Sequence, residues 1–173
     1  SNAQVQNQLS GAQREIDGLE MQANRMFDKL VHSGLSHQDM PFVELAIEQA
    51  RNFERLTEAA LNEGALSLES LFDAQLVEIE GSNPARFRTK LSAWADAHWR
   101  PEYDRAKQLA PEILTVVCTS STGFLPTHMS EFSRQPTGDV AHDTRYCRNG
   151  RVFFEGVDVI AKASEQDYTM AVY

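Results

Sequence analysis

The sequence predicts an α+β protein with a helical N-terminal half and a smaller β-rich C-terminal part. Three observations support this. Apolar residues recur every three or four positions up to residue 109, β-branched residues gather from residue 113 onward, and breakers such as Gly64 and Pro111 separate these stretches. The chain has 173 residues, 42% of them hydrophobic and 24% charged, which is enough to bury a core. A single domain over residues 34–173 is the simplest expectation.

The first predicted element is a long helix over residues 4–33. Its apolar residues alternate steps of four and three, the a/d pattern of a coiled coil, and the positions between them are mostly polar. Such a stripe either packs within its own domain or joins a second copy of the chain. It consists of Val5, Leu9, Ala12, Ile16, Leu19, Ala23, Met26 and Leu30. Residues 1–3 resemble the remnant of a cleaved tag, which suggests a fragment of a longer protein.

Two further helices are predicted over residues 41–63 and 84–110, forming a helical hairpin. Pro41 stands where a first helical turn tolerates proline. Residues 81–84, Gly-Ser-Asn-Pro, are expected to form a loop ending in an N-cap and a proline at the first helical position. Pro101 is expected to kink the third helix or to restart it.

A short helical turn is expected between these two helices. Ser67 is a suitable N-cap for it, because a serine side chain accepts a hydrogen bond from a free backbone N–H group of the first turn. Its apolar residues are expected to plug the core rather than to form a site. They are Leu68, Leu71 and Phe72.

The mixed β region is predicted over residues 112–173. The β-branched run 113–119 indicates a strand, the turn at 121–123 leads into a return strand that begins at Phe124-Leu125, and a long irregular loop follows. Further strands are expected at 151–154 and 168–173, whereas residues 157–164 fit either a loop or a short helix. Because the chain ends inside the last strand, either the sheet is small or strands are missing beyond Tyr173.

Charge and motif content argue against several functions. Acidic residues outnumber basic ones by 25 to 16, a formal net charge of -9, which disfavours non-specific binding to nucleic acids and to anionic membranes. No apolar run approaches the roughly 18 residues of a membrane span. The sequence also lacks a Walker loop and the patterns GxSxG, HExxH and EF-hand, so we expect a protein that is not an enzyme.

Polar and ionisable residues are dense between Cys118 and Arg151, within the predicted irregular loop and after it. Such density suits a pocket for a polar ligand. An arginine can clamp a carboxylate, an aspartate can accept from an ammonium or hydroxyl group, and a tyrosine can form a wall. The alternative is structural: the aspartates cap turns, His128 fills a polar slot, and the arginines pair with local carboxylates. The candidate ligand-binding residues are His128, Arg134, Asp139, His142, Tyr146 and Arg148.

The two cysteines, Cys118 and Cys147, are too few for a disulfide scaffold. They are either two free thiols or one disulfide. With His128 and His142 they form a possible zinc set of two nitrogens and two sulfurs, although the spacing matches no standard finger. No local feature marks an activated thiol, so a Cys–His nucleophilic pair is equally disfavoured. No metal or cofactor is expected.

The same region resembles a sensory domain of bacterial methyl-accepting chemotaxis proteins. The resemblance extends over most of the chain, and its most specific part lies between residues 123 and 151. The residues that carry it are Gly123-Phe124-Leu125-Pro126-Thr127-His128, Ser130-Glu131-Phe132-Ser133-Arg134, Pro136-Thr137-Gly138-Asp139, His142-Asp143 and Tyr146-Cys147-Arg148-Asn149-Gly150-Arg151.

This resemblance implies a PAS-like or Cache-like module, with helices packed on a small antiparallel sheet, in a receptor that controls a histidine kinase. In similar domains the last strand continues into an Arg-rich turn and two more strands, so the resemblance also implies a sheet truncated at Tyr173. The implied partners are a small-molecule ligand, a second copy of the chain through the first helix, and the signalling domain of the same receptor, whether membrane-associated or cytoplasmic. The alternatives are a structural dimerisation module and a metal or redox sensor that uses Cys118 and Cys147.

Overall fold

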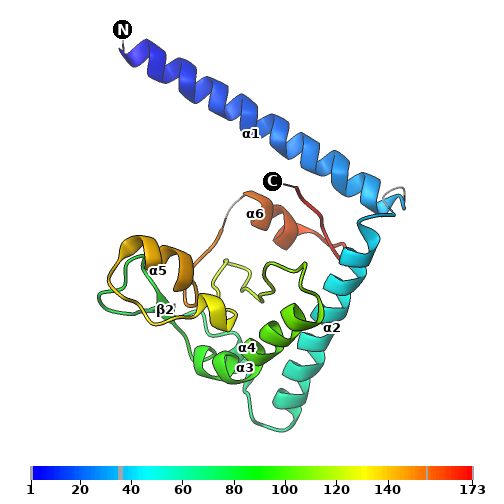
Figure 1. Ribbon diagram of the computed structural model, residues 1–173, viewed down its shortest axis with the longest axis vertical. Coiled ribbons are helices and arrows are strands. Elements are labelled where there is room, and N and C mark those ends of the chain that lie inside the picture. The colour runs from blue at the N-terminus through cyan, green and yellow to red at the C-terminus, as the bar shows by residue number, and fades with distance from the viewer. Residues whose placement is uncertain (1, 35–36, 155, 173) are drawn as a thin grey trace. The chain divides into compact units, whose positions relative to one another are not determined.

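The computed structural model describes residues 2–34, 37–154 and 156–172. It is rich in helix and has a small antiparallel sheet, in agreement with the predicted α+β class (Figure 1). In chain order the elements are α1 (Asn2–His32), α2 (Met40–Asn62), α3 (Leu68–Leu71), β1 (Val77–Glu78), β2 (Phe87–Arg88), α4 (Ser92–Leu109), the short 3₁₀ helix η1 (Ser130–Phe132), α5 (Val140–Tyr146) and α6 (Gly156–Ala163).

The chain divides into two compact units. One unit contains Ser1–Glu48 with Ala163–Tyr173, and the other contains Gln49–Lys162, so the division falls within α2. No helix among the described residues is both long enough and apolar enough to cross a membrane.

In the first unit, α1 confirms the predicted long helix. All eight side chains of the apolar stripe are exposed, whereas Val31, outside the stripe, is buried. The described part of the C-terminal segment is bound to the second half of α1. The Met170 and Val172 N–H groups each donate at 2.9 Å, to Asp28 Oδ1 and Asn24 Oδ1 respectively. The predicted strand at 168–173 is therefore wrong for the residues described, because helix side chains replace a neighbouring strand; Tyr173 lies outside the described residues.

The second unit has its core between α2 and α4. The α4 side chains of Ala95, Trp99, Tyr103 and Ala106 recur at helical spacing and form one buried face. Phe53 of α2 packs against Tyr103 with ring centroids 5.0 Å apart. Helix α4 continues through Pro101, so the expected restart there is wrong. The proline removes one hydrogen bond, to the carbonyl of Ala97, and the buried face to either side of it offsets that loss.

The predicted start of the third helix at residue 84 is also wrong. The helix begins at Ser92, and the residues before it form a hairpin in which Val77 pairs with Arg88 and Glu78 with Phe87. The Asn83-Pro84 peptide, which is cis, lies in the hairpin turn. Ser82 organises this turn rather than a helix start: its hydroxyl donates to the Ile79 carbonyl at 2.7 Å and accepts from the Arg86 N–H at 2.9 Å.

Ser67 caps α3 as predicted, because its side chain accepts from the Ser70 N–H. The expected apolar plug is only partly formed. Leu71 packs against the core, but Leu68 and Phe72 are 63% and 74% exposed, because one helical turn can direct only one face inward.

Among the described residues of 112–173, the predicted sheet is largely absent. Residues 113–119 are not a strand: instead of pairing with a neighbour, the Cys118 N–H donates to the Tyr103 hydroxyl at 2.9 Å. The predicted strand starts at 124 and 151 do meet, through one antiparallel bridge between Phe124 and Val152. Residues 157–164, which fitted a loop or a helix, are helical up to Ala163, as part of α6.

Candidate functional site

The candidate site is built on a segment that is irregular yet buried. Every residue from Gly123 to Met129 is buried, and Thr127 and Met129 are 0% and 1% exposed. Such a segment needs partners for its backbone polar groups, because a buried polar group without a hydrogen bond is costly. Hydrogen bonds to residues 150–153 supply several of them: Leu125 N–H donates to the Arg151 carbonyl at 2.9 Å, and Phe153 N–H to the Gly123 carbonyl at 2.9 Å.

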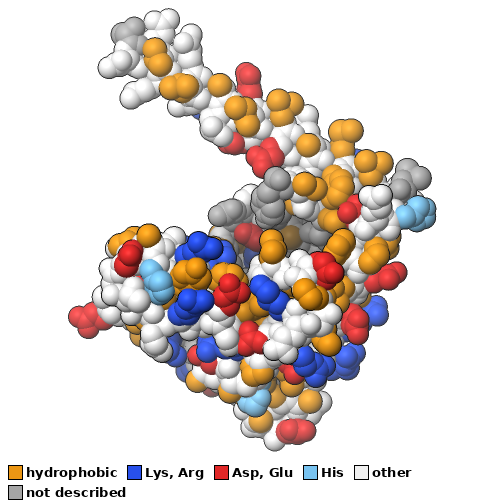
Figure 2. Space-filling model, in the orientation of Figure 1, with side chains coloured by type: hydrophobic (Ala, Val, Ile, Leu, Met, Phe, Trp, Pro, Cys, Tyr) orange, Lys and Arg blue, Asp and Glu red, His pale blue; other side chains and the backbone are white. Residues whose placement is uncertain are grey.

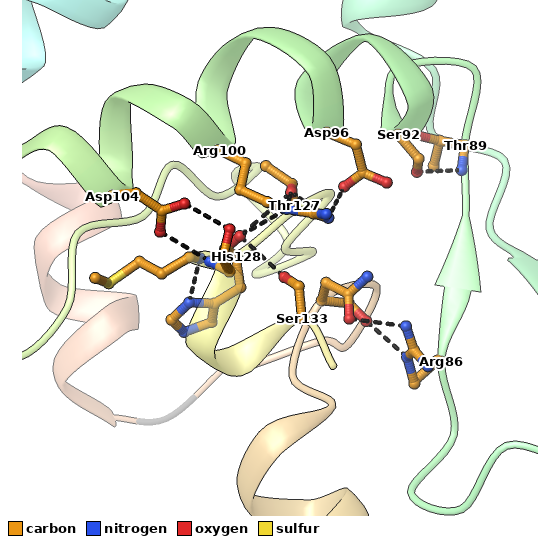
Figure 3. Close-up of polar contacts among 12 residues, drawn as sticks. Arg86, Thr89, Ser92, Asp96, Arg100, Asp104, Thr127, His128 and Ser133 are labelled. Atoms are coloured by element: carbon orange, nitrogen blue, oxygen red, sulfur yellow. Dashed lines mark hydrogen bonds and ion pairs between the residues drawn. The ribbon is translucent and has the colours of Figure 1, made fainter. Parts of the chain in front are cut away.

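Helix α4 supplies the remaining anchors through a row of polar side chains (Figure 3). The Arg100 Nε donates to Thr127 Oγ1 at 3.2 Å and to the His128 carbonyl at 3.1 Å, while its Nη2 donates to Thr127 Oγ1 and pairs with Asp96. One turn further along, Asp104 accepts from the Ser130 N–H at 2.9 Å and from its hydroxyl. These contacts fix the loop to the helix without a strand.

His128 lies inside this anchored loop and serves it structurally. Its Nδ1 accepts from the Met129 N–H at 2.8 Å, and its ring lies 4.9 Å from that of Phe132. Burial, with the positive charges of Arg148 and Arg100, lowers the pKa of His128 to about 4. The ring is therefore neutral near pH 7, and only Nε2 is left to meet a ligand.

A second antiparallel bridge, between Ser133 and Cys147, brings together candidates that are distant in the sequence. The Arg134 N–H donates to the Tyr146 carbonyl at 3.0 Å. In this register the Arg134 guanidinium carbon lies 4.2 Å from the centroid of the Tyr146 ring, and that of Arg145 lies 5.2 Å from it. Arg134 and Tyr146 thus form one stacked pair.

The same bridge places Arg148 against two phenyl rings. Its N–H donates to the Phe132 carbonyl at 2.8 Å, and its guanidinium carbon lies 5.6 Å from the centroid of Phe132 and 5.2 Å from that of Phe153. Arg151 lies over Phe153 as well, at 4.7 Å. We call Arg134, Arg145, Arg148 and Arg151 the arginine cluster. None of its members forms an ion pair with a carboxylate among the described residues.

The acidic candidate Asp139 has a local structural role. Its side chain accepts from the Ala141 and His142 N–H groups and so caps α5. The neighbouring Asp143 is buried and binds His142 Nδ1 at 2.9 Å. The hydrogen bond from His142, with others from Thr137 and Gly138, holds the pKa of the Asp143 carboxyl well below its usual range. The candidate His142, itself a residue of α5, is therefore held beside a charged carboxylate of the same helix.

The possible zinc set is not assembled. Among the residues described, the potential metal ligands that come together are His142, Asp143 and Cys147, within 4.8 Å of one another, without Cys118 or His128. Asp143 Oδ1 already accepts from Thr137 and faces the Cys147 thiol at 3.7 Å. We assign no metal to this group, because its one carboxylate is satisfied by protein donors.

The two cysteines are free thiols in the structure. Burial is the main cause that raises the pKa of each, and a thiol with a raised pKa carries little of the reactive thiolate at neutral pH. This environment disfavours a redox role for either cysteine.

Sequence reasoning missed the residues that hold the site in place and part of the site itself. Asp96, Arg100 and Asp104 recur every four residues on α4, so the sequence does place them on one helix face, but this spacing by itself indicates only the polar side of an apolar helix. Arg151 and Phe153 were assigned to a strand and were not among the candidate ligand-binding residues, although the four arginines between residues 134 and 151 of an acidic chain are a visible signal. A small hollow near β2, lined by Arg86, Phe87, Ser92, Asp96 and Asn149 among others, contains none of the six candidates.

Comparison of the chain with protein-family models, with curated proteins and with solved structures gives no match. Functional inference therefore rests on the residues and contacts described above.

Proposed function

We propose that this chain is a non-catalytic ligand-sensing domain of a bacterial methyl-accepting chemotaxis receptor, with a PAS-like or Cache-like fold. The observation that carries the proposal is the arginine cluster. Arg134 and Arg148 belong to the segment that resembles such domains and flank the bridge between Ser133 and Cys147. Each guanidinium lies over an aromatic ring, that of Tyr146 or Phe132, and neither forms an ion pair with a described carboxylate.

A ligand would meet guanidinium groups that are already oriented. The rings of Tyr146 and Phe132 and, for Arg134, a hydrogen bond from Nε to the Glu131 carbonyl at 3.1 Å orient these groups, so less side-chain freedom remains to be lost on binding. With respect to the described residues, the other guanidinium N–H groups of both arginines are left for a ligand. A charged donor in such a position forms stronger hydrogen bonds than a neutral one. The site is therefore suited to recognise a ligand.

The exposed stripe of α1 supports the receptor role independently. Its side chains follow a coiled-coil pattern and lie open to solvent, so a second copy of α1 is the natural partner. A ligand that binds one conformation of the sensing unit more tightly than another would shift the population, and a paired helix would pass that bias to the signalling domain.

A structural dimerisation module is the second candidate, because the stripe alone would be sufficient for it. The two functions differ in what they require of the arginine cluster. A dimerisation module needs no ligand and tolerates alanine at Arg134 and Arg148, whereas a sensor does not.

Native mass spectrometry of the purified chain tests the proposal. We expect a dimer that carries a small organic molecule, and we expect the variant Arg134→Ala/Arg148→Ala to remain a dimer but to lose that molecule. The control is Arg51→Ala/Arg105→Ala, which removes two exposed arginines outside the cluster. A bound molecule retained by the cluster variant contradicts the proposal. So does an empty chain that gains no thermal stability from a panel of amino acids and organic acids.

A further inference from the structure

Two arginines of the cluster share one aromatic ring. The guanidinium carbons of Arg148 and Arg151 lie 5.2 and 4.7 Å from the centroid of Phe153. Backbone hydrogen bonds to two other segments, residues 123–125 and Phe132, hold residues 148–153 in place. Leu125 N–H binds the Arg151 carbonyl, Phe153 N–H binds the Gly123 carbonyl, and Arg148 N–H binds the Phe132 carbonyl, all at 2.8 to 2.9 Å. The fold therefore holds the backbone of both arginines close to Phe153, and both guanidinium groups lie over its ring.

This arrangement is electrostatically unfavourable in the absence of an anion. Burial lowers the pKa of Arg151, and the charge of Arg148 lowers it further. No described carboxylate forms an ion pair with either residue, although the whole chain has nine more acidic than basic residues. Two partly buried like charges that lie over one ring would be stabilised by a bound counter-charge.

The donors of both groups remain largely free. Arg151 uses one N–H, which donates from Nη1 to the Thr144 carbonyl at 3.1 Å. The structure gives the Arg148 side chain no hydrogen bond to a described residue. Figure 2 shows Lys and Arg side chains gathered on the part of the surface that contains α5. Planar guanidinium forks match the oxygens of carboxylate and phosphate groups and bind them through two parallel hydrogen bonds.

We infer that Arg148 and Arg151, set on the ring of Phe153, form a binding site for a small dianion with oxyanion groups, such as a dicarboxylate or a phosphate. The inference rests on the proposed sensing function and names the ligand class of its site. Two fixed positive charges favour a ligand with two negative charges over one with a single charge. The ring shields one side of the arginines from water, which strengthens the charged hydrogen bonds that form there.

Titration calorimetry with defined probes tests this site. Succinate represents dicarboxylates, inorganic phosphate represents phosphoryl groups, and acetate is the singly charged comparison. We expect at least one dianion to bind, and to bind more tightly than acetate. Each of the variants Arg148→Gln and Arg151→Gln should weaken that binding about tenfold, the equivalent of one lost charged hydrogen-bonding partner. Binding of succinate only assigns the site to carboxylates, and binding of phosphate only assigns it to phosphoryl groups.

Two further variants keep the test decisive. Arg105→Gln removes an exposed arginine outside the cluster and should bind the dianion as the unchanged protein does. Arg148→Lys keeps the charge but not the planar fork, so its affinity should lie between those of the unchanged protein and Arg148→Gln. Circular dichroism confirms that each variant is folded. Equal affinity in Arg148→Gln, Arg151→Gln and the unchanged protein overturns the inference, and so does the absence of binding by both dianions.

Failure of this site is distinguishable from failure of the sensing function. If the chain carries an organic molecule that Arg151→Gln retains, and neither dianion binds, the dianion site is wrong and the sensing domain stands. If a dianion binds at the two arginines but the chain stays monomeric and unchanged in its helix content, the site stands and the sensing function loses its support.

Discussion

Helix α1 and the segment 123–151 reverse the usual relation between regular structure and burial. Helix α1 is a regular helix of 31 residues with a single buried side chain among those described. The segment 123–151 has only η1 and the short α5 as regular elements, yet it contains a continuous buried run. Periodicity therefore indicates backbone conformation, while burial depends on which partners surround a segment.

The two regions differ in where their backbone N–H and C=O groups find hydrogen-bond partners. A helix satisfies its own N–H and C=O groups within itself and can stand in water. The segment 123–151 satisfies its groups through residues far away in the sequence, such as Arg100 for the His128 carbonyl and Gly123 for the Phe153 N–H. Substitutions should accordingly have large effects in the second region and small ones in the first.

The largest effect is expected from Gly150→Ala. Gly150 has a φ of +78°, and a Cβ atom there would lie 2.5 Å from the carbonyl oxygen of Phe87. The substitution combines a strained backbone with a clash against backbone atoms of β2, and we expect it to lower the free energy of unfolding by about 3 kcal/mol or more. Denaturant unfolding followed by tryptophan fluorescence measures it.

Gly138→Ala is the matched control. Gly138 has a similar φ of +85°, but a Cβ atom there has no neighbour within 4 Å. Only the cost of the left-handed conformation remains, so we expect a loss of about 1 kcal/mol. Equal losses in the two variants would show that residues 149–151 are not packed against β2 as described.

The next effect is a pH dependence that arises from His128. Its pKa is about 4 in the folded protein, because of burial and the charges of Arg148 and Arg100, and about 6.5 when unfolded. Between these values the unfolded state binds a proton that the folded state does not, so stability is full above pH 6.5 and falls as the pH drops toward 4. We expect this residue alone to remove about 3 kcal/mol over that range.

The control for that prediction is His128→Asn. An asparagine oxygen can accept from the Met129 N–H as Nδ1 does, but it does not titrate. Urea unfolding at a series of pH values gives the free energy of unfolding as a function of pH. Between pH 4 and 6.5 this free energy should fall steeply in the unchanged protein, and less steeply in the variant by the contribution of His128. Parallel curves would mean that the ring is free to take a proton in the folded state.

A smaller effect is expected from Arg100→Lys. The lysine keeps the charge beside Asp96 but lacks the planar fork that donates to both Thr127 and the His128 carbonyl. Thr127 Oγ1 then loses its donor, and the His128 carbonyl keeps only hydroxyl donors, from Ser133 and, at 3.5 Å, from Thr127. We expect a loss of about 2 kcal/mol, measured by thermal unfolding. Arg105→Lys, at an exposed pair with Glu102 on the same helix, should change stability by less than about 0.5 kcal/mol. A similar loss of stability in both variants would contradict the role of Arg100 as an anchor of the buried loop.

The sequence predicts elements with local backbone partners better than those with distant ones. Helices α1 and α2 and the cap at Ser67 were predictable, because their signals are local: apolar spacing, Gly64 after α2, and a serine before a turn. The β region was not, because pairing is a non-local property. Residues 113–119 have the composition of a strand, but the structure gives Cys118 a tyrosine hydroxyl in place of a neighbouring strand.

The candidate site was predictable in residue type but not in arrangement. The density of arginine, histidine and tyrosine indicated the segment, and the stack of Arg134 on Tyr146 lies within it. The sharing of Phe153 by Arg148 and Arg151 depends on the Phe124–Val152 bridge, which no sequence spacing predicts. The structural roles of Asp139 and His128 were anticipated as the alternative to ligand binding, because both residue types readily form local hydrogen bonds to the backbone.

The smallest effect on stability is expected on α1, and it tests whether the stripe is an interface. Leu19 lies in the stripe and is 65% exposed, while Met21, on the opposite face, is 42% exposed. In the monomer, Leu19→Lys and Met21→Lys should each change the free energy of unfolding by less than about 0.5 kcal/mol, because neither side chain is packed. In sedimentation velocity at increasing concentration, only Leu19→Lys should abolish the dimer, because it places a charge in the seam between two helices. Loss of the dimer in both variants, or in neither, would place the interface somewhere other than the stripe.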